Sequence, residues 1–137
     1  MLARTHIAVG VAAAYSIVRP ETAAEALPVI VGGALGSLIC DFEFKGFGHR
    51  GFSHSLLALV LETAILQLLV PAAALPFAVA FASHVLLDIT NKKSVRLFYP
   101  AKWGICLGWF YADRLANKAF ATIGIIWLLL TFLIIRS

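Results

Sequence analysis

Five continuous apolar runs constrain the fold of this chain more than any other feature of its sequence. They cover residues 7–18, 27–40, 52–70, 71–89 and 119–135. Continuous runs favour helices, because the strands of a membrane barrel alternate apolar and polar residues. A helix needs ~20 apolar residues to cross the ~30 Å hydrocarbon core of a bilayer, so the first two runs are short. The sequence therefore predicts an all-α, polytopic membrane protein with about five apolar helices.

The composition supports lipid as the main solvent of the chain. Hydrophobic residues make up 61% and charged residues 13% of the sequence, and the mean hydropathy is +0.93. Soluble domains have about 45–50% apolar and about 25% charged residues. A length of 137 residues suits one helical membrane domain over 1–137. The spacing of Cys40 and Cys106 predicts two free thiols.

The one long connection, residues 90–118, mixes basic and aromatic side chains. Its basic residues are Lys92, Lys93, Arg96, Lys102, Arg114 and Lys118, and its aromatic residues are Phe98, Tyr99, Trp103, Trp109, Phe110 and Tyr111. This mixture is typical of the membrane–water interface. The loop is expected to be a lid or an interfacial helix that contacts membrane lipids. Despite the net charge of +4, the chain is not expected to bind nucleic acid.

The distribution of basic residues predicts the orientation. If the runs alternate in direction, the N-terminus and the loops 41–51 and 90–118 share one side, with nine of the eleven basic residues. The other side receives Arg19 and Arg136. The positive-inside rule then places the first side in the cytoplasm. A re-entrant hairpin formed by the first two runs would leave this assignment unchanged.

Six polar residues fall at the cytoplasmic end of this arrangement. They are His6, Asp41, His49, His54, His84 and Asp88, and they include every histidine of the chain. Neutral imidazole and carboxylate groups suit zinc or another first-row divalent ion. His84 and Asp88 are four residues apart, so they share one helix face. The pattern fits a shared metal site and a set of ordinary interfacial residues equally well.

Three residues around this cluster each have two candidate roles. Glu43 is either a ligand or a solvated loop charge, and Arg50 either grips a phosphate or serves as a topogenic cation. Glu62, inside the third run, is expected either to have a structural role or to orient the metal ligands through a hydrogen bond. Gly51 permits a tight turn between His49 and His54, and Ser53 is a candidate cap for the third helix.

Several motifs together resemble a known family. They are Arg4-Thr5-His6, Asp41 after a glycine-rich run, His49-Arg50-Gly51-Phe52-Ser53-His54-Ser55, Ser83-His84-Val85-Leu86-Leu87-Asp88 and Tyr99-Pro100. They resemble the YdjM-like family of bacterial inner-membrane proteins, described as membrane-bound metal-dependent hydrolases, over about residues 3–103. The block around His49 to Ser55 is the most specific of these motifs.

The resemblance implies a helical fold in the bacterial inner membrane and a divalent metal, zinc above all. It also implies a more distant similarity to zinc-dependent phospholipase C, and hence cleavage of a lipid phosphoester. The family usually has Asp-x-Asp where this chain has Asp41-Phe42-Glu43, and no histidine follows His84, so one or two ions are expected.

On the leading hypothesis the chain is a metal-dependent hydrolase of a lipid-like substrate. The expected ligands are His6, Asp41, His54, His84 and Asp88; the expected catalytic residues are Asp41, Glu43 and His49; and Arg50 is expected to bind substrate.

Two other hypotheses remain. The second is a non-catalytic membrane protein in which a metal or a polar cluster holds helix ends together. The third is a metal carrier or sensor, although transport needs polar groups across the bilayer, and beyond Glu62 the runs offer mainly Gln67.

Overall fold

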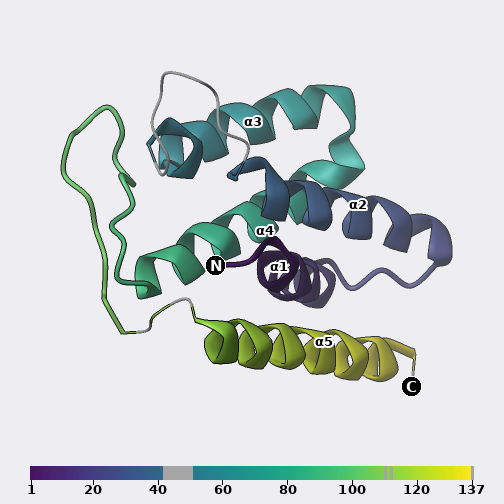
Figure 1. The fold of residues 1–137 in the computed structure, drawn as a ribbon. Helices are drawn as coiled ribbons and strands as arrows, with labels where there is room; N and C mark the ends of the chain where they lie inside the picture. The colour runs from purple at the N-terminus through teal and green to yellow at the C-terminus, as the bar shows by residue number, and fades with distance from the viewer. Residues whose placement is uncertain (42–50, 110, 112, 137) are drawn as a thin grey trace.

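The computed structural model describes residues 1–41, 51–109, 111 and 113–136. These residues form five α-helices and one 3₁₀ turn (Figure 1). The elements are α1 (Ala3–Val18), α2 (Ala23–Ile39), η1 (Phe52–His54), α3 (Leu56–Leu69), α4 (Pro71–Thr90) and α5 (Arg114–Arg136). The predicted all-α fold with about five apolar helices is confirmed.

Two of the helices, α4 and α5, are long and apolar enough to cross a bilayer, with 20 and 23 residues. The first two helices are short, as predicted, with 16 and 17 residues. The third is shorter than the run 52–70 suggests, because η1 precedes it and α3 keeps only 14 residues. Ser55, rather than the predicted Ser53, caps α3: its hydroxyl accepts from the amide of Ala58 at 3.1 Å.

Glycines bring α2 and α4 into close contact. A Cβ atom on Gly32 would lie 2.5 Å from the carbonyl oxygen of Ala73, and one on Gly36 would lie 2.2 Å from that of Phe77. Both pairs are spaced four residues apart, so each helix presents one face to the other. The small residues of α2 therefore let its backbone approach that of α4 closely.

The central helix of the bundle is α1, which lies between α5 and the α2–α4 pair, while α3 packs on α4 (Figure 1). Its contacts with α5 run along both helices in the same order. The side chain of Asn117 accepts from the amide of Leu2 at 2.7 Å, and the hydroxyls of Ser16 and Thr131 lie 3.0 Å apart. The two helices are therefore parallel.

The segment that joins α4 to α5 folds back along the bundle. Val95 and Ile105 form an isolated antiparallel bridge, and the amide of Leu107 donates to the carbonyl of Ile89 at 2.7 Å. The carbonyl of Leu97 accepts from the amide of Leu56 at 3.0 Å, which ties the segment to the start of α3. No helix forms between α4 and residue 109, so the predicted interfacial helix is wrong there, and the lid alternative stays a prediction.

Candidate metal centre

Five of the predicted ligands meet at one end of the bundle. His6 lies in the first turn of α1, Asp41 follows α2, and His54 belongs to η1. His84 and Asp88 lie on α4. All three imidazole side chains are fully buried, Asp88 is 2% exposed, and Asp41 is 34% exposed. Residues more than eighty positions apart in the sequence are therefore neighbours, as the alternating helix directions predict.

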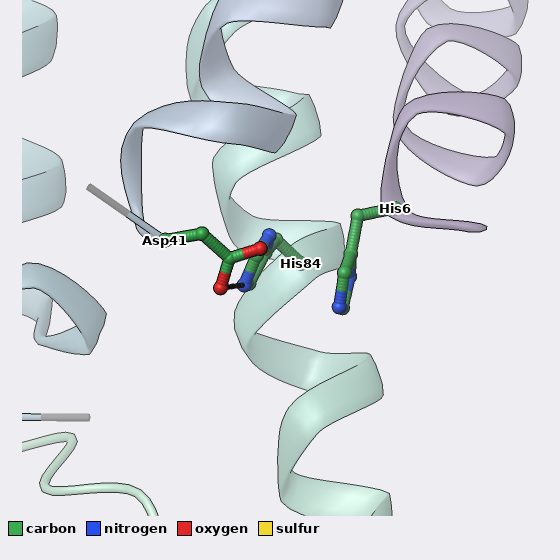
Figure 2. Close-up of side chains that lie close together, drawn as sticks. All are labelled: His6, Asp41 and His84. Carbon is green, nitrogen blue, oxygen red and sulfur yellow. Dashed lines mark ion pairs between the residues drawn. The ribbon is translucent and has the colours of Figure 1, made fainter. Parts of the chain in front are cut away.

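The five side chains form two overlapping triads. His6, Asp41 and His84 make the first (Figure 2), and His54, His84 and Asp88 make the second. In each triad one ligand atom from every residue lies within 4.8 Å of the others. The Nε2 atom of His84 is 3.6 Å from Asp41 Oδ1. Asp88 reaches the other two imidazoles, with Oδ1 3.6 Å from His6 Nε2 and Oδ2 3.5 Å from His54 Nε2.

These separations fit a bound divalent ion. Zinc binds nitrogen and oxygen at about 2.0–2.2 Å with tetrahedral geometry, which puts its ligand atoms roughly 3.3–3.6 Å apart. Direct hydrogen bonds are shorter, about 2.7–3.2 Å. Both ring nitrogens of His6 and Nε2 of His84 are buried, and none of the described residues forms a hydrogen bond with them. Buried polar atoms normally have one, so the donor set is suited to a metal.

Contacts at the Nδ1 atoms of His84 and His54 fix the orientation of these two imidazoles. His84 Nδ1 donates to the backbone carbonyl of Ser37 at 2.7 Å. Because a carbonyl only accepts, the proton of His84 is on Nδ1, and Nε2 presents a lone pair to the cluster. His54 Nδ1 lies 3.1 Å from the Ser53 hydroxyl. Such contacts on the far nitrogen are a regular feature of metal-binding histidines.

His84 is the centre of the cluster. Its ring stacks on that of His6, with centroids 3.6 Å apart and planes at 15°. It meets the ring of His54 edge to face, with centroids 5.1 Å apart. Because Nδ1 of His84 is used by Ser37, only Nε2 remains for both triads. The described ligands therefore suit one ion rather than two.

Some groups that contact the cluster could not be predicted from the sequence. The amino group of Met1 lies 3.1 Å from Asp88 Oδ1, and the acceptor for His84 is a backbone carbonyl. Every residue carries a carbonyl, so Ser37 can be identified only from the folded chain. Ser53 is next to His54 in the sequence, and its hydroxyl is the partner that sequence reasoning assigned to a helix cap instead.

Three predicted residues, Glu43, His49 and Arg50, lie outside the described part of the chain. Their roles as catalytic groups and phosphate ligand stay predictions. Glu62 lies in an apolar pocket between α2, α3 and α4, with Leu35 and Phe77 among its neighbours. Its Oε2 atom is buried and forms no hydrogen bond with any residue in the described part of the chain, and Glu62 belongs to neither triad.

The chain matches a known family of membrane proteins. Over residues 1–136 the chain matches the family described as YdjM inner membrane protein. It is 39% identical over 66 residues to the inner membrane protein YdjM of Escherichia coli (strain K12), a match that covers 43% of this chain and 34% of the relative. The YdjM protein of Shigella flexneri is similar to the same extent. The match thus spans about a third of the length of these curated relatives. No solved structure matches the chain.

Proposed function

Because this chain belongs to the YdjM family of inner membrane proteins, we propose that it is a metal-dependent hydrolase of a membrane-lipid phosphoester or a related amphiphile. The observation that supports the proposal is the convergence of three buried histidines and two aspartates from four separate elements. Buried ionisable groups in a membrane protein are costly and mark functional sites by default. Zinc is the ion that best matches this imidazole and carboxylate set.

The ligands would come from His6, Asp41, His54, His84 and Asp88, of which each triad supplies three and His84 belongs to both. When bound, the ion supplies a Lewis acid that polarises the phosphoryl group and lowers the pKa of water to about 7. The protein supplies the orientation, because the Ser37 carbonyl holds the proton of His84 on Nδ1 and keeps Nε2 free. It also excludes bulk water, since the three imidazoles are fully buried.

Asp41 is the residue best placed for proton transfer. It is the most exposed member of the cluster, at 34%, so substrate and water reach it first. A carboxylate oxygen of Asp41 would accept the proton of the attacking water, the task of a general base. Glu43 and His49 are further candidates for this role, and Arg50 for holding the phosphate.

A structural metal site is the second candidate. Four of the five ligands are buried to 2% exposure or less. Structural zinc sites are closed by four protein ligands, whereas catalytic sites keep an open position. The two functions therefore differ in whether Asp41 stays bound to the ion or gives way to substrate.

The proposal includes a membrane orientation. The chain would form one multi-pass domain over 1–137 with its N-terminus and metal centre facing the cytoplasm, where membrane lipids supply the substrate. Reporter fusions at the C-terminus would test this orientation. An odd number of crossings predicts a periplasmic reporter, and a cytoplasmic C-terminus would contradict it.

Elemental analysis of the detergent-purified protein tests the metal. We expect close to one zinc per chain in the wild type and loss of that zinc in His54→Ala and His84→Ala. Ser83→Ala is the matched control, because its hydroxyl bonds to the carbonyl of Ala80 on the same helix. A wild type without stoichiometric metal after gentle extraction would refute the metal site.

Activity assays then separate the two candidates. The loaded protein would be assayed on a panel of phospholipids and phosphodiesters beside Asp41→Asn. Turnover by the wild type that Asp41→Asn abolishes, when the variant is assayed with saturating zinc, supports the hydrolase. Bound zinc with no turnover on any member of the panel favours the structural site.

A further inference from the structure

A second polar site lies at the far end of α1 and α5 from the metal centre. It is a groove of ≈ 670 Å³ lined by Ser16, Arg19, Glu21, Trp127, Thr131, Ile134, Ile135 and Arg136. Thirteen residues of sequence separate His6 from Arg19, which is ~20 Å along a helix. The groove therefore has no contact with the proposed active site and is independent of the proposed function.

The charges of this groove suit a phosphate. Arg19 and Arg136 enter it from two helices, and Glu21 is the acidic residue of its lining. A guanidinium group matches the oxygens of a phosphate with a planar fork of donors. Trp127, which is 42% exposed, adds the kind of aromatic surface found at the level of lipid headgroups.

The backbone of Arg19 points to a role for its side chain. Arg19 ends α1 in the left-handed conformation, with φ 52° and ψ 60°, and its amide donates to the carbonyl of Tyr15. Glycine is the usual residue at such a position, because a Cβ atom is strained there. The Nε atom of Arg19 donates to the carbonyl of Ser16 at 3.4 Å, so the side chain stabilises the helix end and also brings its guanidinium group to the groove.

An apolar groove begins where the polar one ends. Its volume is ≈ 510 Å³, and its lining is almost entirely apolar: Tyr15, Ala23, Ala26, Leu27, Ile30, Leu128, Leu129, Phe132 and Arg136. Arg136 lines both grooves, and its guanidinium carbon lies 4.7 Å from the ring centre of Phe132. A charged end that continues into an apolar track matches an amphiphile.

We propose that these two grooves bind a membrane phospholipid. Its phosphate lies between Arg19 and Arg136, and one acyl chain follows the apolar groove between α2 and α5. The carboxylate of Glu21 accepts a hydrogen bond from an amine on the same headgroup, so a phosphoethanolamine lipid binds more tightly than a phosphoglycerol lipid. The lipid fills the space beside α5, which packs on the rest of the bundle mainly through α1.

Fluorescence of Trp127 measures this binding. The full chain carrying Trp103→Phe and Trp109→Phe keeps Trp127 as its one tryptophan. In detergent, phosphoethanolamine lipid with brominated acyl chains is expected to quench it with a saturable curve. Arg19→Gly and Arg136→Ala are expected to weaken this binding roughly 10-fold or more, the effect of losing a charge-assisted hydrogen bond. Arg114→Ala, at the other end of α5, is the matched control and keeps wild-type binding.

Arg19→Gly separates loss of binding from loss of fold. Glycine suits the left-handed backbone, so the lipid-free thermal midpoint of this variant is expected to equal or exceed that of the parent. Wild-type affinity in both Arg19→Gly and Arg136→Ala would overturn the proposal, as would quenching that never saturates. Millimolar inorganic phosphate that displaces the lipid completely would show a free-phosphate site instead. Glu21→Gln is expected to remove the preference for phosphoethanolamine over phosphoglycerol lipid.

Discussion

The two longest helices, α4 and α5, have similar hydropathy and opposite environments. Each contains a window apolar enough to span a bilayer, but 50% of that window is buried in α4 and only 6% in α5. Helix α4 carries His84 and Asp88 of the candidate metal centre, whereas α5 supplies no member of either triad. Hydropathy therefore identifies a membrane helix without revealing whether it builds the site or faces the lipid.

The difference follows from the surfaces that each helix meets. Helix α4 packs on α1, α2 and α3, and Gly32 and Gly36 let α2 approach its backbone. Polar side chains on α4 can therefore face other protein groups. Helix α5 meets the bundle mainly along α1, so most of its circumference must be apolar to suit lipid.

The largest expected effect comes from separating α2 and α4. In Gly36→Ala the new Cβ would lie 2.2 Å from the backbone oxygen of Phe77, and backbone cannot give way as a side chain does. We expect a loss of about 3 kcal/mol in unfolding free energy, together with loss of zinc, measured by denaturation in detergent and by elemental analysis. Gly33→Ala is the control, because its Cβ would lie 3.3 Å or more from α1. Equal stability of the two variants would contradict the close packing of α2 on α4.

Removing a charge from α4 tests its role as a ligand helix. Asp88→Asn keeps the shape of the side chain but lowers its affinity for a cation, and we expect at least about 100-fold weaker zinc binding. Competition with a chromophoric chelator measures this change. Asp113→Asn is the matched substitution outside the cluster and should leave zinc affinity unchanged. Wild-type zinc affinity in Asp88→Asn would show that Asp88 is not a ligand and that α4 supplies only His84.

On α5 a buried polar residue matters for stability rather than for the metal. The side-chain oxygen of Asn117 accepts from the amide of Leu2 and from the hydroxyl of Thr5. Asn117→Ala leaves those donors without this acceptor, which costs about 1–3 kcal/mol and lowers the thermal midpoint. Zinc content should remain at the wild-type level. If zinc were lost as well, α5 would help to shape the centre through α1, and the contrast between α4 and α5 would weaken.

The smallest effect is expected on the exposed side of α5. Leu133 is 63% exposed, and Leu133→Ala should change the unfolding free energy by no more than about 0.5 kcal/mol. A much larger destabilisation would mean that this face is covered by another protein surface rather than by lipid.

Much of the fold and of the candidate site could be predicted from the sequence. The position of each polar residue at the start or end of an apolar run placed His6, Asp41, His54, His84 and Asp88 at one end of the bundle, where the structure brings them together. The third run was harder to interpret. Hydropathy treats residues 52–70 as one helix, but Ser55 bonds to the carbonyl of Phe52 and to the amide of Ala58 and so separates η1 from α3.

Hydropathy and chain direction are local properties, so they were enough to predict the class of fold, the number of helices and the end of the bundle where His6, His54 and His84 lie. The folded chain was needed to show that His84 is shared by both triads and takes its orientation from the Ser37 carbonyl. It alone also distinguished buried α4 from exposed α5. These features depend on which helix faces approach each other, and that is decided by packing between residues far apart in the chain.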